Sequence, residues 1–308
     1  MALQKEESVM RNLIRVNFLR WKNKLSTIYC LIGTICCAVF NCVTAYKEEI
    51  IGRIVFDRSY FPTCMTAAML LTAAAILLNR GEGDPVRNAV IAGYSKTQIL
   101  LAELLPALVF ACISALIMLL PMLRAPVVLR RFPAADLLLG AVGILLMFCT
   151  AAVLCVMLAT ICQNRAFAIL LSTAVLLFGV ITSKPLVESL RHPPTIPAGY
   201  NTFLDKDMKL HYEITEEKPN PSYVAPPDRY RVITLAGMLP QSVLTTAVIY
   251  LDTDPKPDAN ITQTEKDYLN WSRTQCLFLM RLLPFCETGM MLLITGLGLL
   301  RFRRTDMN

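Results

Sequence analysis

The stretch LLLGAVGILLMFCTAAVLCVMLATI, residues 137–161, decides the fold class, because no charged side chain interrupts it. A helix of about 20 mainly apolar residues is long enough to cross the hydrocarbon core of a bilayer. The rest of the chain has a similar character, since 55% of its 308 residues are hydrophobic and only 17% are charged. Soluble domains carry about 25% charged residues. The sequence therefore predicts a membrane protein.

Six apolar runs predict an all-α polytopic protein with six transmembrane helices. They cover residues 25–45, 61–78, 99–120, 137–161, 166–183 and 284–300. A single transmembrane domain then spans 1–308, with a cytoplasmic helix over 1–24, five membrane helices within 25–183, an extracellular segment over 184–283, the sixth membrane helix and a tail over 301–308.

A seventh candidate, residues 232–250, is interrupted by Pro240 and Gln241. Short cytoplasmic loops collect Lys and Arg. With six helices and a cytoplasmic N-terminus, the inner segments hold 13 Lys and Arg residues, whereas the short outer segments hold 6. A seventh span would place the basic tail outside, so the charge bias favours six helices with both termini in the cytoplasm.

The long segment between the fifth and sixth helices has two parts. Its first part is rich in Pro, Asn and Tyr, which indicates turns and extended chain. From Asp228 onward its apolar residues recur at helical spacing, with a break at Pro240. We interpret this second part as an external cap on the outer mouth of the bundle; a loosely ordered loop is the alternative.

The N-terminal residues form a basic amphipathic helix. Arg11, Arg15 and Lys22 share one face, and apolar residues ending at Trp21 share the other. Such a helix is suited to the cytoplasmic membrane interface, with the indole of Trp21 at headgroup depth. A basic anchor that only orients the first span would also explain the charges.

The stretch RNAVIAGYSKTQILLAELL, residues 87–105, contains a short structured segment between the second and third spans. Val86 and Val90 lie on one side of a short helix and Arg87 on the other, and Gly93 supplies the turn that ends it. Tyr94 follows, and Ser95 with Gln98 matches a capping box that starts the third span. This segment is either a strap on the membrane surface or a docking site for a partner.

The reactive side chains give little sign of chemistry. Ten of the eleven cysteines fall within or beside apolar runs, so we predict core packing, without disulfides or a metal site. Cys276 alone falls in the outer segment. Glu287 is expected near the outer end of the sixth helix, where contact with water explains its charge. The only histidines, His192 and His211, lie in the outer segment, so no catalytic set is predicted.

The order of these features resembles the membrane subunits of bacterial ABC transporters of the type-2 exporter class. The resemblance covers nearly the whole chain and is sharpest over residues 87–105, with a further likeness in MLPQSVL, residues 238–244. It implies that the short helix docks on a separate cytoplasmic ATPase, through Val86, Arg87, Val90, Gly93, Tyr94 and Ser95. ATP and Mg would be bound by that partner, because this chain has no phosphate-binding loop of the G-x-x-x-x-G-K-[ST] type.

The resemblance also implies a second permease chain, as a homodimer or heterodimer, and a location in the bacterial plasma membrane. No cofactor, catalytic residue or nucleic acid is expected for the chain itself. The composition of the spans favours an amphipathic or lipid-like or peptide-like substrate, whose binding residues are unknown. Two alternatives stay open: a polytopic membrane enzyme, and a sensor or immunity component without ATP-driven flux.

Overall fold

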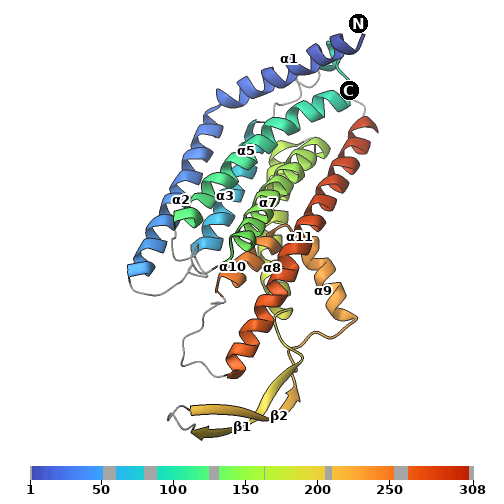
Figure 1. The fold of residues 1–308 in the computed structure, drawn as a ribbon. Coiled ribbons are helices and arrows are strands. Elements are labelled where there is room, and N and C mark those ends of the chain that lie inside the picture. Colours follow the sequence, from blue (N-terminus) through green and yellow to red (C-terminus); the bar gives the residue numbers. More distant parts are fainter. Residues whose placement is uncertain are drawn as a thin grey trace.

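The protein is a bundle of long helices, seen in a computed structural model that describes residues 2–50, 60–79, 89–124, 132–162, 164–204, 210–252 and 263–304 (Figure 1). Its elements are α1 (Ala2–Lys22), α2 (Leu25–Ile50), α3 (Tyr60–Asn79), α5 (Lys96–Arg124), α7 (Ala134–Ile161), α8 (Arg165–Ser189), β1 (Thr195–Leu204), β2 (Leu210–Pro219), α9 (Asp228–Gly237), α10 (Gln241–Asp252) and α11 (Gln263–Arg304).

Six of the described helices are long and apolar enough to cross a membrane, namely α2, α3, α5, α7, α8 and α11. The protein is therefore an all-α polytopic membrane protein, as the sequence predicts. The helix α7 lies in the middle of the bundle, where it contacts α3, α5, α8, α10 and α11. In its membrane segment 67% of the residues are buried, against 22% in α2 at the edge of the bundle.

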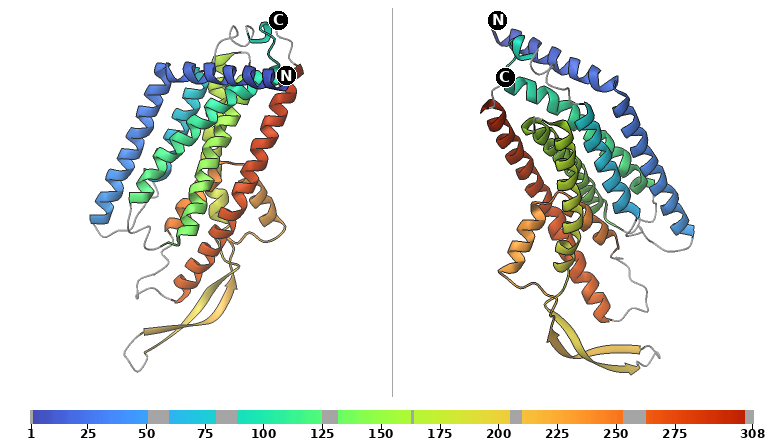
Figure 2. Two further views of the ribbon diagram at one scale, coloured as in Figure 1. Left: turned by 45° about the horizontal axis from the view of Figure 1, so that its top comes forward. Right: turned by 180° about the vertical axis from the view of Figure 1, so that it is seen from behind.

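The two ends of the bundle differ (Figure 2). At one end, here called the α1 end, α1 runs across the bundle, and the chain termini lie close by. At the other, here called the hairpin end, the ribbon formed by β1 and β2 projects away from the helices. The strands pair antiparallel, with Thr195 opposite Pro219 and Leu204 opposite Leu210. The first part of the long segment is thus a β-hairpin, consistent with the extended chain expected there.

The last helix corrects the predicted boundaries of the sixth span. It begins at Gln263, well before residue 284, and continues through Pro284 to Arg304. Buried residues recur along this early part at helical spacing, at Ser272, Cys276 and Leu279. Continuous apolarity marks only the later part of this helix, because its early part is an amphipathic stretch that packs on its neighbours. Cys276 consequently lies in a helix, with its side chain buried, and not in an outer loop.

The predicted external cap is also wrong in its position. The helices α9 and α10 form a bent pair, with an angle of 109° between them at a short break. The second helix of the pair does not lie over the end of the bundle but enters it, and contacts α3, α7, α8 and α11. Small residues make room for α10, since a methyl group at Gly143 would overlap Val243 and one at Gly179 would overlap Gln241.

Candidate functional site

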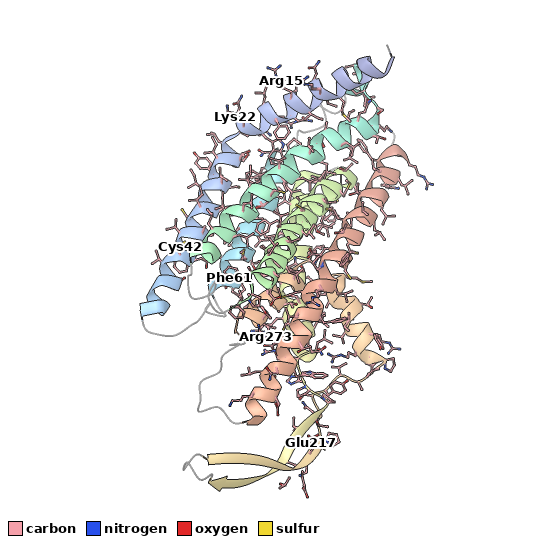
Figure 3. All side chains as sticks on the ribbon, viewed as in Figure 1. Arg15, Lys22, Cys42, Phe61, Glu217 and Arg273 are labelled. Carbon is pink, nitrogen blue, oxygen red and sulfur yellow. The ribbon has the colours of Figure 1, made fainter. Side chains whose placement is uncertain are left out.

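The basic face of α1 is exposed at the α1 end. Arg11, Arg15 and Lys22 are exposed, and Figure 3 shows Arg15 and Lys22 on the side of α1 that faces away from the bundle. Trp21 is half-buried, and its ring lies 5.7 Å from that of Phe110 in α5, between centroids. The three basic side chains are exposed as predicted, whereas Val16, predicted on the apolar face, is also exposed. The same helix thus combines an aromatic contact with the bundle and an exposed basic surface.

A polar joint fastens the start of α2 to the end of α3. The Lys24 ammonium donates to the backbone oxygens of Leu78 at 3.2 Å and Asn79 at 3.0 Å. Ser26 donates to the side-chain oxygen of Asn79, whose amide nitrogen donates to Thr27. Asn79 is only 1% exposed, so this joint is internal. Sequence reasoning missed it, although polar side chains at two span ends are a signal that could have suggested it.

The turn predicted at Gly93 is confirmed in detail. Residues Ala89–Ile91 are helical, and Gly93 has a φ of 88°. Its amide donates to the Val90 oxygen at 2.9 Å, and the Tyr94 amide donates to the Ala89 oxygen at 3.1 Å. This pair of bonds is the Schellman arrangement that ends a helix, and it favours glycine at the position with positive φ.

The predicted capping box is confirmed as well. The Gln98 amide donates to the Ser95 hydroxyl at 3.2 Å, and the Ser95 amide donates to the Gln98 side-chain oxygen at 3.0 Å. Val90 and Tyr94 are half-buried, whereas Gly93 and Ser95 are exposed. Val86 and Arg87, the other two candidate docking residues, lie outside the described residues.

An apolar side chain of the short helix is exposed in this turn. Ile91 is 74% exposed at the α1 end, next to the candidate residues. The segment therefore combines two fixed turns with an exposed apolar side chain, which is a geometry suited to contact with a partner or with lipid. We call residues 89–95 the capped segment.

A second polar region lies inside the bundle, at the tip of the bent pair formed by α9 and α10. Gln241 and Ser242, the first two residues of α10, are 3% and 0% exposed. The Gln241 amide nitrogen donates to the backbone oxygen of Leu176 in α8 at 3.3 Å and approaches the Met69 sulfur in α3 at 3.8 Å. The Gln241 side-chain oxygen and the Ser242 hydroxyl have no hydrogen-bond partner among the described residues.

Glu287 lies at the same depth as this tip. The helices α7 and α11 run side by side, and their contacts join Gly140 to Met280 at one level and Met157 to Gly298 at another. Glu287 falls midway between these contacts, and therefore near the middle of the bundle. Its predicted place near the end of the sixth helix is wrong, because α11 begins some 20 residues earlier than the apolar run suggested.

The carboxyl group of Glu287 has no partner among the described residues. The side chain is 2% exposed, and neither carboxyl oxygen has a hydrogen bond. The tip of the bent pair reaches the same point, since a methyl group at Gly237 would touch the neighbouring Cys286. Ionisable residues inside a membrane bundle are costly, and for that reason they mark functional sites.

Side-chain bonds near the hairpin end hold the bent pair in place. The Tyr250 hydroxyl in α10 donates to Asp136 at the start of α7 and accepts from Arg273 in α11 at 3.2 Å. The Arg273 guanidinium lies 5.5 Å from the centre of the Tyr250 ring. One tyrosine therefore connects α10 to two membrane helices. Figure 3 shows Arg273 on α11, toward the hairpin end.

The first helix of the bent pair is fastened in a similar way. Arg229 in α9 donates to the Leu190 oxygen at 3.0 Å and to the Gln275 side chain at 2.7 Å. Arg191, just after α8, donates to Ser272 in α11 at 2.9 Å. These bonds join the ends of α8, α9 and α11, so both helices of the pair are fixed at the hairpin end while their tip lies deep in the bundle.

The chain matches no model of a known protein family, no curated protein and no solved structure. All eleven cysteines are free. The described residues contain no group of three His, Cys, Asp or Glu side chains that could hold a metal ion.

Proposed function

We propose that this protein is the membrane permease subunit of a type-2 ABC exporter. In this proposal the capped segment docks on a separate cytoplasmic ATPase, and movement of the segment is passed to the membrane helices. The α1 end then faces the cytoplasm and the hairpin end faces outward. A second permease chain completes the transport pathway in the plasma membrane, and the substrate is amphipathic.

The observation that carries the proposal is the construction of the capped segment. It ends in a Schellman turn and continues directly into α5 through the Ser95–Gln98 capping box. A force on a segment held by two such turns is transmitted to α5 and is not absorbed by a flexible loop. The joint between Lys24 and Asn79 ties the end of α3, just before this segment, to the start of α2.

The bent pair of α9 and α10 supports the same proposal. It lies between the fifth and sixth spans in sequence and is inserted among α3, α7, α8 and α11. A change in the packing of α3 or α5 therefore reaches the pair through α7, which contacts α3, α5 and α10. Neither a membrane enzyme nor a sensor has a comparable observation in its favour.

The test is a pull-down of the detergent-solubilised protein from its native membrane, with ATPase activity assayed in each eluate. We expect wild type to carry an ATPase, and the double variant Arg87→Glu with Tyr94→Ala to lose it. The matched control makes the same chemical changes at the hairpin end, Arg231→Glu with Tyr230→Ala, where both side chains are exposed. Loss of the ATPase in both variants, or in neither, contradicts docking through the capped segment.

A further inference from the structure

We propose that Cys112 and Cys149 are a redox-active thiol pair, whose reversible disulfide ties α5 to α7 when the surrounding lipid is oxidised. The two Sγ atoms lie 3.6 Å apart, close enough for one thiol to donate a hydrogen bond to the other. All eleven cysteines are free, and the described residues show no other hydrogen bond between two thiols. The inference goes beyond the proposed function, because it concerns chemistry of the chain itself.

The geometry of the thiol pair suits the closure of a disulfide. An S–S bond is about 2.05 Å long, so the two sulfurs have to approach by about 1.6 Å. Small rotations of the two side chains about their Cα–Cβ bonds can supply this approach with the helices in place. The helices α5 and α7 lie side by side (Figure 1), and small buried residues such as Ala111, Ala115 and Ala152 allow close contact between them.

The thiol pair lies in the part of the bundle that lipid surrounds. Cys112 is near the midpoint of α5, and Cys149 is near the midpoint of α7. Cys112 is half-buried, and Val109 and Leu116, on the same side of α5, are 39% and 56% exposed. Exposed apolar side chains of a membrane span face lipid, which is as apolar as they are. Cys149 is only 7% exposed. A reagent dissolved in the hydrocarbon therefore meets Cys112 first.

The oxidant that this setting favours is an apolar hydroperoxide, such as one formed on an unsaturated acyl chain. The Cys112 sulfur attacks the terminal oxygen of the peroxide and becomes a sulfenic acid, while the thiol proton passes to the departing oxygen and gives an alcohol. The Cys149 sulfur then attacks the Cys112 sulfur, and the hydroxyl group leaves with the Cys149 proton as water. Each sulfur loses one electron, and the two electrons reduce the peroxide bond. Because Cys149 already touches Cys112, it captures the sulfenic acid before a second oxidation.

The disulfide would fix two helices that meet different parts of the protein. The helix α5 continues from the Ser95–Gln98 capping box, whereas α7 contacts α3, α8, α10 and α11. A covalent bond between them restricts the movement of α5 relative to the rest of the bundle. In the proposed exporter this restriction would slow the coupled ATPase, and that consequence alone rests on the proposed function.

The first measurement uses wild-type protein in nanodiscs that contain phosphatidylcholine hydroperoxide, with unoxidised phosphatidylcholine as the control. The protein is then unfolded in the presence of N-ethylmaleimide, which blocks free thiols, and peptide mass spectrometry reads the products. We expect two peptides joined through Cys112 and Cys149, absent without hydroperoxide and lost after treatment with dithiothreitol. Cys155, buried in the same helix as Cys149, is expected to stay a free thiol. Sulfinic acid at Cys112 without the joined peptides, or no oxidation of either thiol, overturns the inference.

The second measurement repeats the oxidation with Cys112→Ala. The matched control is Cys162→Ala, because Cys162 is half-buried as Cys112 is. We expect Cys149 to stay a free thiol in Cys112→Ala, and the joined peptides to form in Cys162→Ala as in wild type. Oxidation of Cys149 to the wild-type extent in Cys112→Ala overturns the inference; if that variant does not fold, the measurement on wild type decides.

The link to transport is measured separately, as the ATPase activity of the pull-down eluate before and after oxidation. We expect oxidation to lower the activity with wild type, dithiothreitol to restore it, and Cys112→Ala to show no loss. Equal losses in the two proteins, or none in either, contradict the link to the ATPase alone. Failure of the pull-down with the joined peptides present would contradict the transporter alone, and the reverse result would contradict the thiol pair alone.

Discussion

The capped segment and the bent pair of α9 and α10 interrupt the same bundle in opposite ways. In the capped segment, short-range bonds such as Ser95 with Gln98 fix the chain, and the exposed side chains face away from the core. In the bent pair, contacts between residues far apart in sequence fix the chain, as where Gln241 bonds Leu176. The comparison teaches that the conformation of a surface segment can be predicted from neighbouring residues in the sequence. The position of an inserted segment depends instead on the space that other helices leave.

The largest expected effect tests the insertion of α10. Gly179→Leu places a side chain where the Gln241 amide lies, and overpacking of this kind costs about 3 kcal/mol. We expect a clear loss in the free energy of unfolding, measured by denaturant unfolding in mixed micelles. The matched control is Gly289→Leu in α11, where a Cβ would meet no atom within 4 Å. Equal losses in the two variants would mean that α10 is not held against α8.

The next effect concerns Glu287 in α11, whose carboxyl group has no hydrogen-bond partner among the described residues. Glu287→Gln replaces this carboxyl with an amide that cannot ionise, and an ionised carboxylate is the more costly group to bury. We expect this variant to be more stable than wild type by about 2 kcal/mol. The same unfolding assay measures it, with Glu217→Gln as a control near zero. A loss of stability would mean that Glu287 has a bonded partner in the folded protein.

A smaller effect is expected in the capped segment. Gly93→Ala puts a Cβ on a residue with a φ of 88°, which costs about 1–2 kcal/mol. We expect faster hydrogen exchange at the amides of Gly93 and Tyr94, with global unfolding little changed, because the strain is local. The control is Gly296→Ala, within α11, where a Cβ has open space. Unchanged exchange would show that the turn is not needed to hold the segment.

The smallest effect is expected from Ser95→Ala. It removes the hydroxyl that accepts from the Gln98 amide, and loss of an N-cap side chain costs about 1 kcal/mol or less at an exposed site. We expect faster hydrogen exchange in the first turn of α5 only. Exposed Ser222→Ala, in a loop at the hairpin end, serves as the control. An effect spreading into the bent pair would contradict the separation drawn between the two regions.

The boundaries of the membrane helices show where sequence reasoning succeeded and where it failed. The run 137–161 closely matches α7, because a continuous apolar stretch has to be helical to satisfy its backbone in lipid. The start of α11 was missed by some 20 residues, since polar residues such as Lys266 and Asp267 dilute the apolar signal there. That part of the helix is held by the packing of Cys276 and Leu279. The average apolarity of the stretch does not reveal this packing.

The sequence by itself determined that this is an all-α membrane protein, the basic face of α1, the turn at Gly93 and the Ser95–Gln98 capping box. Each of these depends on residues within a few positions of one another, so local periodicity and turn chemistry are sufficient. Only the tertiary structure decided that α10 enters the bundle and that Glu287 lies at mid-depth beside its tip. Those placements depend on the space left by Gly143 and Gly179 in other helices. The pattern of residues within one segment carries no information about that space.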